Sequence, residues 1–223
     1  MKFDLHSHTI YSSRTKWAFE SIIKPDDLIK LAIKQGLDGI AVTDHETFKG
    51  VLECLKIVRR KKSDLMIIPG VEISSKDGHI LGLGIEEWNV DKKMTAEEAI
   101  DSIRDFGGIA IAAHPLVSGI SRRGLGKLIE NLDIDGVEVL NYRTSKNDNQ
   151  QALRIAKELN LGVTAGSDAH MPSDIGKVWT FSESDDIIES ILKRETKVFG
   201  EEMPKFQRHF YQLNKIVRSF GLL

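Results

Sequence analysis

The feature that most constrains this chain is a recurring one: short apolar segments end in histidine or a carboxylate. There are five such endings: Asp4-Leu5-His6-Ser7-His8, Thr43-Asp44-His45, Gly70-Val71-Glu72, Ala113-His114-Pro115 and Ser167-Asp168-Ala169-His170. In an extended chain, residues two apart project to the same side, so His6 and His8 can point at a single metal ion. One His-x-His pair is weak support for a metal site. Five endings of this kind indicate that their side chains act together.

The apolar segments themselves predict β-strands. They cover residues 2–5, 38–43, 66–73, 80–84, 108–113, 135–140, 162–166 and 178–181. Several are apolar without interruption, which is typical of strands buried on both faces of a parallel sheet.

Helical patterns lie between most of these strands. Pro25-Asp26-Asp27 suits the first turn of a helix that Gly36 ends, and Thr95-Ala96-Glu97-Glu98 has the pattern of a capping box. Residues 148–160 and 185–193 are also amphipathic. Repeated strand–helix units predict parallel strands joined by right-handed crossovers.

A closed barrel explains the polar endings better than an open sheet does. In an open α/β sheet, ligands gather at a switch point that few strands reach, whereas a barrel brings all its strand ends to one rim. The endings run from residue 6 to residue 170. We therefore predict an α/β fold with a TIM-like barrel, irregular because the chain is short for eight full units.

Length and composition fit this fold and restrict the function. A chain of 223 residues can form one domain with a sizeable core, and a net charge of −2 argues against a dedicated nucleic-acid coat. Cys54, the one cysteine, is expected in the core or on a helix surface. The first strand starts almost at the N-terminus and no apolar run reaches membrane-spanning length, so we expect a cytoplasmic protein.

The residue types at the endings suit divalent metal ions. Six of the seven histidines lie in or beside the endings, together with two carboxylates: His6, His8, His45, His79, His114, His170, Glu72 and Asp168. Imidazole and carboxylate ligands suit Zn, Mn or Fe. One tetrahedral ion needs fewer ligands, so two or more ions are expected. A carboxylate such as Glu72 could bridge a pair about 3.5–4 Å apart, the spacing used in two-metal displacement reactions.

The five endings, in this order, resemble the motifs of the polymerase and histidinol phosphatase (PHP) domain family, from about residue 2 to about residue 200. The resemblance implies a distorted (βα)7 barrel with a phosphoesterase site of two or three metal ions. It also implies that His6, His8, Glu72 and Asp168 hold one ion and that Glu72, His79 and His114 hold a second. His45 and His170 would contribute to a third, and Asp168 and His170 would assist catalysis.

The chain departs from the family pattern after the first motif. Many relatives have an aspartate or histidine there as a third-metal ligand, where this chain has Ser13, so a two-metal enzyme is also conceivable. Arg14 and Lys16 are candidates for binding substrate phosphate, as is Arg143 after residues 135–140.

Other polar residues near the strand ends have simpler interpretations. Asp44 is expected to orient a histidine and Asn141 to line the pocket. Arg122, Arg123 and Lys177 are further basic candidates near strand ends, and for each of them surface charge is the preferred interpretation.

The C-terminal segment is predicted to be separate from the barrel. Apolar residues from Phe206 to Phe220 recur at helical spacing, with basic residues on the other face. We therefore divide the chain into a barrel, residues 1–200, and an amphipathic helix, residues 201–223. That helix packs on the barrel or on a second subunit of a homo-oligomer, or it contacts a nucleic acid or a membrane surface.

These observations favour a metal-dependent hydrolase of phosphate monoesters, acting on a small phosphorylated metabolite or nucleotide. The first alternative keeps the metals but changes the bond, as in a nuclease that acts on nucleic-acid ends or in an amidohydrolase. The second is an RNA-binding barrel without catalysis, which should lack the metal residues and carry a basic surface.

Overall fold

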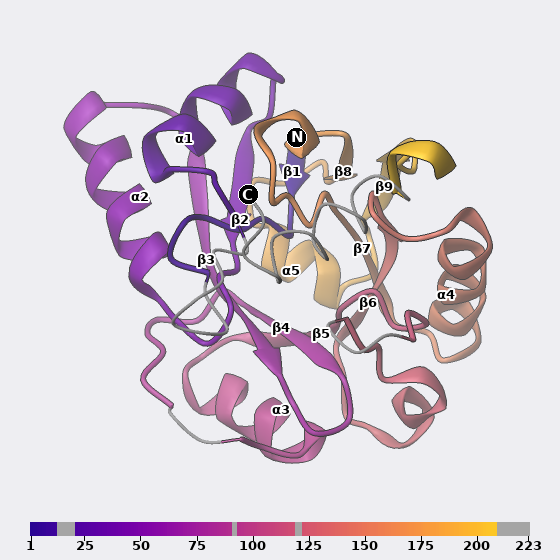
Figure 1. Cartoon of the computed structure of the whole chain (residues 1–223). Helices are drawn as coiled ribbons and strands as arrows, with labels where there is room; N and C mark the ends of the chain where they lie inside the picture. Colours follow the sequence, from indigo (N-terminus) through magenta and orange to yellow (C-terminus); the bar gives the residue numbers. More distant parts are fainter. Residues whose placement is uncertain (13–20, 91–92, 119–121, 209–223) are drawn as a thin grey trace, which may run out of the picture.

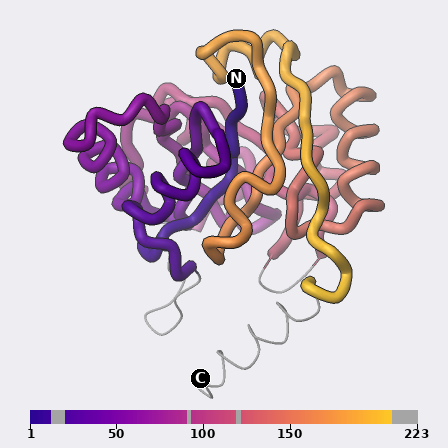
Figure 2. The backbone as a smooth tube through the Cα atoms, turned by 90° about the horizontal axis from the view of Figure 1, so that it is seen from above, coloured from indigo at the N-terminus to yellow at the C-terminus, as the bar shows by residue number. Residues whose placement is uncertain are grey.

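The computed structural model describes residues 1–12, 21–90, 93–118 and 122–208. Seven strands, in part separated by helices, form the barrel: β1 (Lys2–Asp4), β2 (Gly39–Val42), β3 (Met66–Ser74), β4 (His79–Leu83), β5 (Ile109–Ala112), β6 (Gly136–Asn141) and β7 (Gly162–Gly166). Two more, β8 (Val178–Phe181) and β9 (Lys197–Gly200), extend the sheet beyond β1, giving the order β7-β6-β5-β4-β3-β2-β1-β8-β9. In Figure 2 the orange and yellow segments that carry β8 and β9 run beside the indigo start of the chain.

The helices surround this sheet. They are α1 (Pro25–Lys34), α2 (Lys49–Lys61), α3 (Ala96–Asp105), α4 (Lys146–Glu158) and α5 (Ile187–Leu192), with two 3₁₀ turns, η1 (Gly126–Asn131) and η2 (Pro172–Asp174). Figure 1 shows α1 to α4 around the outside of the sheet and α5 near its centre. The predicted capping box forms at the start of α3, where Thr95 accepts a hydrogen bond from the backbone of Glu98.

The sheet closes into a barrel where the chain continues past β1 and β7. The Leu5 N–H donates to the Ala165 carbonyl at 3.2 Å, and the Asp168 N–H donates to the His6 carbonyl at 2.8 Å. The His8 N–H donates to the Ala169 carbonyl at 3.1 Å. These bonds tie the two ends of the seven-stranded sheet together, which confirms the predicted distorted barrel.

Strand direction differs from the prediction in two places. β4 is antiparallel to β3 and β5, and β8 is antiparallel to β1. Only residues 75–78 connect β3 to β4, whereas a parallel crossover needs a dozen or more residues. The sequence analysis also missed β9, an edge strand with mostly exposed side chains.

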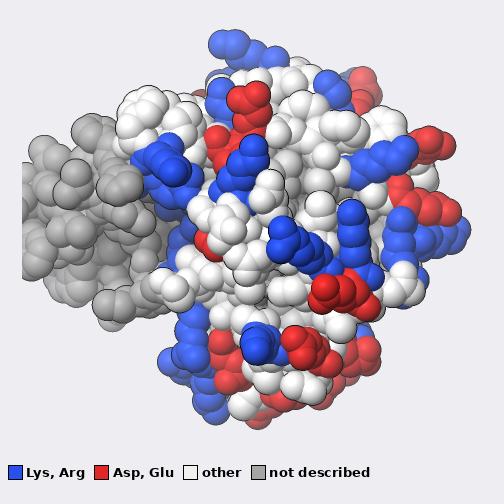
Figure 3. Space-filling model, turned by 90° about the vertical axis from the view of Figure 1, so that its right-hand side faces the viewer, with Lys and Arg blue, Asp and Glu red and all other residues white. Residues whose placement is uncertain are grey.

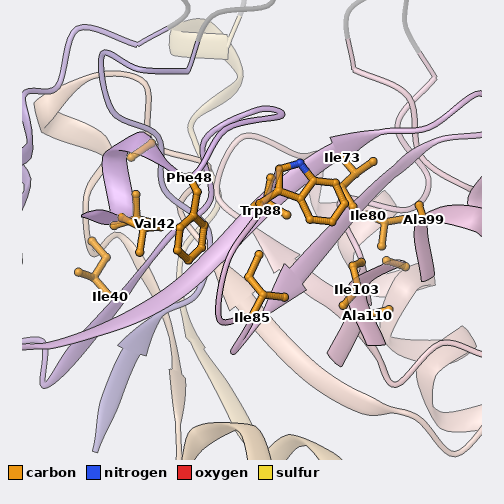
Figure 4. Packing of buried hydrophobic residues seen from close by; sticks show 14 of the residues in the cluster. Ile40, Val42, Phe48, Ile73, Ile80, Ile85, Trp88, Ala99, Ile103 and Ala110 are labelled. Carbon is orange, nitrogen blue, oxygen red and sulfur yellow. The ribbon is translucent and has the colours of Figure 1, made fainter. Parts of the chain in front are cut away.

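The strands alternate between two apolar layers. Ile40 and Val42 of β2 face the helices in the larger cluster, while Ala41 faces the smaller one. Figure 4 shows Phe48, Ile85 and Trp88 packed in the larger cluster. The smaller cluster lies inside the barrel and includes Ile187 and Ile191 of α5: Phe3, Leu5, Ala41, Ile68, Leu81, Leu83, Ile109, Ile111, Ala113, Ile187 and Ile191.

The surface carries both signs of charge. Figure 3 shows Lys and Arg interspersed with Asp and Glu over one side of the molecule. None of the described helices has the length and apolar character that crossing a membrane requires.

Candidate metal centre

All eight predicted metal ligands lie together at the rim where β1, β2, β3, β5 and β7 end. His6 and His8 follow β1, and His45 follows β2. His79 begins β4 rather than ending a strand. Because β4 is antiparallel to β3, its first residue pairs with Ser74 at the end of β3 and so reaches the same rim.

Glu72 occupies the middle of this cluster. Its Oε1 lies 2.6 Å from Nδ1 of His79 and 3.1 Å from Nε2 of His114. The other oxygen, Oε2, contacts the Nε2 atoms of three histidines. These distances are 3.4 Å for His6, 3.2 Å for His8 and 3.1 Å for His45. Glu72 therefore has the position of a bridging ligand.

The potential ligand atoms fall into three groups, each with its members' atoms within 4.8 Å of one another. The groups are His6, His8 and Glu72; Glu72, His79 and His114; and His8, His45 and His170. Two of them share Glu72, and His8 belongs to two. These groups overlap with the ligand sets that the family resemblance implies, but Asp168 belongs to none of them and His8 is an additional member of the third. Oδ1 of Asp168 lies 4.0 Å from Nε2 of His6 and 3.6 Å from Nε2 of His8.

Buried hydrogen bonds hold the histidine-bearing loops in place. Asp44, expected to orient a histidine, instead accepts two bonds from Thr9, at 2.6 Å each from its backbone N–H and its hydroxyl. Asp44 thereby fixes the loop that follows His8. Gly50 leaves room for this contact, since a Cβ there would lie 1.9 Å from Oδ2 of Asp44.

A second buried aspartate joins β1 to β7. Asp4 accepts hydrogen bonds from the backbone N–H of Ser167 at 2.9 Å and of Gly176 at 3.0 Å. Burial raises the pKa of Asp4 to about 6, although the hydrogen bonds from Ser167 and Gly176 oppose the rise. Asp4 therefore sets the relative position of the loops that carry His6 and Asp168.

The second carboxylate of the metal cluster, Asp168, is paired with two arginines. Its Oδ1 lies 3.0 Å from Arg143 and its Oδ2 lies 2.6 Å from Arg122. Burial alone would raise the pKa of Asp168, but the two guanidinium groups outweigh it and hold this pKa well below its usual range. The interpretation of Arg122 as surface charge is wrong: its side chain is 18% exposed and turns inward, because a buried carboxylate needs a cationic partner.

The same two arginines keep neighbouring imidazoles neutral. Burial and the charge of Arg143 hold the pKa of His170 well below its ordinary value. Burial and Arg122 lower the pKa of His114 to about 3. Neutral imidazoles have the lone pair that a metal requires.

His6 and His8 have the opposite tendency. Burial lowers the pKa of His6, but the carboxylates of Glu138, Glu72 and Asp168 outweigh it and raise the pKa well above its ordinary value. Burial also lowers the pKa of His8, but hydrogen bonds to Asp168 and Glu72 outweigh it and raise the pKa. Yet the Nε2 atoms of His6 and His8 lie 3.1 Å apart, so both cannot carry a proton. A divalent cation would replace these protons.

The donor set therefore fits divalent metal ions. Buried histidine nitrogens and carboxylate oxygens converge at close range, and Nδ1 of His114 has no hydrogen-bond partner among the described residues. The mixture of imidazole and carboxylate suits Zn, Mn or Fe.

Glu138 is the residue of this site that the sequence analysis missed. It is 1% exposed, and its Oε1 lies 3.0 Å from Nδ1 of His6. Its neighbours Val137 and Val139 belong to the cluster that faces the helices, so Glu138 points into the barrel. An acidic residue within an otherwise apolar strand is the signal that could have found it. Asn141, expected to line the pocket, is buried and contacts both Glu138 and Arg122.

Several predictions fall outside the described residues. Ser13, Arg14 and Lys16 belong to the segment 13–20, and the predicted C-terminal helix is described only as far as residue 208. Their proposed roles stay predictions.

Comparison with known proteins extends these observations. A family model described as PHP-associated matches residues 146–196. The chain is 39% identical over 165 residues to the uncharacterized protein MJ1587 of Methanocaldococcus jannaschii, a match that covers 71% of this chain and 94% of that one. It is 26% identical to the protein named probable phosphatase TTE1963 of Caldanaerobacter subterraneus, over 95% of this chain and 92% of that one.

Two further matches are to a nuclease and to a solved structure with a similar fold. The 5'-3' exoribonuclease Rnm of Salmonella typhimurium is 24% identical, over 76% of this chain and 85% of its own length. Among solved structures, a two-domain protein from Bacteroides vulgatus that contains a predicted PHP-like metal-dependent phosphoesterase has a TM-score of 0.71 and 19% identity. That match covers 90% of this chain and 64% of the longer protein.

Proposed function

Because the chain belongs to the PHP family of metal-dependent phosphoesterases, we propose that it hydrolyses a phosphate monoester of a small metabolite or nucleotide. The observation that carries this proposal is a Glu72 carboxylate within 3.4 Å of five histidines, beside an Asp168 paired with two arginines. The cluster can hold metal ions, and the arginines can bind an anion next to them.

The family resemblance supplies the assignment of the residues to separate ions. His6, His8, Glu72 and Asp168 would hold one ion, and Glu72, His79 and His114 a second. His45 and His170, with His8 near them, would hold a third if it is present. Bound divalent ions would activate a water molecule and neutralise charge that develops on the phosphate oxygens.

The chain's own contribution is to bind and orient the phosphate. Arg122 and Arg143 both reach the rim, and guanidinium groups match phosphate oxygens with paired hydrogen bonds. With metal ions bound beside them, two arginines would suit the dianion of a monoester better than the single charge of a diester. This density of positive charge supports the monoester over the diester.

Proton transfer would fall to Asp168 or His170. Nδ1 of His170 lies 2.7 Å from Arg143, and the lowered pKa of His170 leaves its imidazole neutral near pH 7. Asp168 is ionised under the same conditions because both arginines contact it.

The test is a phosphatase screen with metal-free protein reloaded with Mn, Zn or Fe in turn. We expect phosphate release from at least one phosphorylated metabolite or nucleotide, and its loss in His8→Ala and in Asp168→Asn. Lys56→Ala, on the exposed face of α2, serves as the control and should keep full activity. Unchanged turnover in either site variant would refute the assignment.

The similarity to the exoribonuclease Rnm favours one other candidate, hydrolysis at the 5' end of RNA. An RNA oligonucleotide with a 5'-phosphate separates the two. Release of inorganic phosphate supports the monoesterase, whereas release of mononucleotides supports the nuclease.

A further inference from the structure

Glu138 of β6 is a buried carboxylate that no metal group includes, yet it contacts three different parts of the site. Its Oε1 lies 3.0 Å from Nδ1 of His6. Its Oε2 accepts the backbone N–H of His114 at 2.7 Å and the side-chain amide of Asn141 at 3.0 Å. An ionised carboxylate can only accept hydrogen bonds.

This property determines how His6 presents its ring. Nδ1 of His6 lies closer to a carboxylate oxygen than Nε2 does, so Nδ1 carries the proton when the ring is neutral, as metal binding requires. The opposite atom, Nε2, then has its lone pair toward Glu72 and Asp168, at 3.4 Å and 4.0 Å. We propose that Glu138 is a positioning residue, which fixes the tautomer and orientation of His6 for metal binding. The inference rests on the proposed metal role of His6 and not on which phosphoester is hydrolysed.

The same carboxylate connects the metal ligands to the arginine beside them. By binding the amide nitrogen of Asn141, Glu138 turns the other amide atom, Oδ1, toward Arg122 at 3.0 Å. Arg122 in turn contacts Asp168. Glu138 also holds the backbone of His114, which has a φ of +30°. One side chain thereby sets the positions of His6, His114 and Arg122.

Only a carboxylate of this length satisfies all three donors. Glutamine has the same shape but one acceptor oxygen, so its NH₂ group would face either His6 or the donors from His114 and Asn141. Aspartate keeps the charge but is one methylene shorter. Glu138→Gln therefore tests the loss of the charge and of one acceptor oxygen, whereas Glu138→Asp keeps the charge and tests the position of the acceptors.

The experiment measures Co²⁺ affinity and the Co²⁺ absorption spectrum of metal-free protein, so it requires no enzymatic assay. Glu138→Gln and Glu138→Asp should each lower Co²⁺ affinity by about 10- to 100-fold, the usual effect of losing a residue that orients a metal ligand. Their spectra should also change. Ser190→Ala, which removes a buried hydrogen bond between α5 and Ser182, is a control that lowers stability away from the rim. Its affinity and spectrum should match the wild-type protein.

A second measurement follows the ring itself. In metal-free protein at alkaline pH, ¹⁵N NMR of the histidine rings should show His6 as the Nδ1–H tautomer, and Glu138→Gln should change that signal. Wild-type Co²⁺ affinity in Glu138→Gln, or in Glu138→Asp alone, would overturn the inference, as would an Nε2–H tautomer. If the Co²⁺ affinities and the His6 tautomer are as expected but the phosphatase screen finds no substrate, only the proposed reaction is overturned.

Discussion

At the scale of single residues, the site depends on carboxylates that would be unfavourable without their partners. Glu72 is buried, which alone raises its pKa, but the surrounding histidines outweigh burial and hold the pKa well below the usual range. Its two oxygens are shared among five imidazoles. A buried carboxylate of this kind is stable only where protons or metal ions on the neighbouring histidine nitrogens supply positive charge.

Arg122 should act on substrate binding rather than on metal binding. Replacing Arg122 with alanine removes a charge-assisted hydrogen bond to phosphate, worth about 1.5–3 kcal/mol, so KM should rise by roughly 10- to 150-fold. Steady-state kinetics on the best substrate from the screen measures this change.

Arg123 provides the matched control for that variant. It is the next residue, is exposed, and contacts the Lys76 carbonyl away from the metal cluster. Arg123→Ala should leave both KM and the metal content unchanged. Equal KM values for Arg122→Ala and the wild-type protein would exclude Arg122 from phosphate binding.

At the scale of elements, β1 and β7 approach one another closely where their side chains reach the rim. Gly166 ends β7, and a Cβ there would lie 2.2 Å from Cβ of His6 and 2.7 Å from Oε1 of Glu138. Both distances are too short for any residue with a Cβ, so glycine at this position allows His6 and Glu138 to come into contact.

Gly166→Ala should therefore disturb both stability and the site. Overpacking of this kind destabilises by about 1–3 kcal/mol, and the shift of His6 should lower metal affinity. Chemical denaturation and a metal titration measure the two effects.

Thr95→Ala is the control that separates a loss of stability from a loss of metal affinity. It removes the capping box of α3 and should destabilise by about 1 kcal/mol, with metal affinity unchanged. If Gly166→Ala binds metal as tightly as Thr95→Ala does, the close approach at Gly166 has no role in the site.

At the scale of the whole molecule, the metal centre and the barrel closure involve the same segments, so metal binding should stabilise the fold. Free metal ion at about 100 times its dissociation constant would add about 2.7 kcal/mol for each site. Thermal unfolding with and without a chelator tests this, and an unchanged midpoint would contradict it.

The pH dependence of the metal-free protein has a definite sign. The pKa values of His6 and His8 are raised above the ordinary value of 6.5 in the folded state. Since their facing Nε2 atoms cannot both be protonated, the pair holds one additional proton. The contribution of that proton to stability is complete below pH 6.5 and is lost as the pH rises through the raised values. We therefore expect the unfolding midpoint of the metal-free protein to fall as the pH increases above 6.5.

Bound metal should weaken this trend. In the loaded protein, metal ions take the place of the protons on His6 and His8, so the midpoint should vary less with pH over the same range. Calorimetric titration with a divalent ion in two buffers of different ionisation enthalpy should show proton release. An unfolding midpoint of the metal-free protein that increases as the pH is raised above 6.5 would contradict these pKa shifts.

The sequence by itself determined the barrel and the composition of its rim. Uninterrupted apolar runs and helical spacing report burial within a few residues, and polar endings from His6 to His170 are compatible with one common rim. The seven barrel strands, four of the five helices in the described residues and the gathering of the eight ligand candidates follow from such local patterns. The strand of residues 197–200 carries too weak a pattern to be found this way.

Only the tertiary structure decided which partners these residues meet. His6 and Glu138 are 132 positions apart, and Arg122 and Asp168 are 46 apart. Periodicity shows that a side chain is buried but not what lies opposite it. The sequence therefore shows a carboxylate within β6 but not that its oxygens face His6, His114 and Asn141. It also does not distinguish Arg122, whose side chain turns inward, from Arg123, whose side chain stays at the surface.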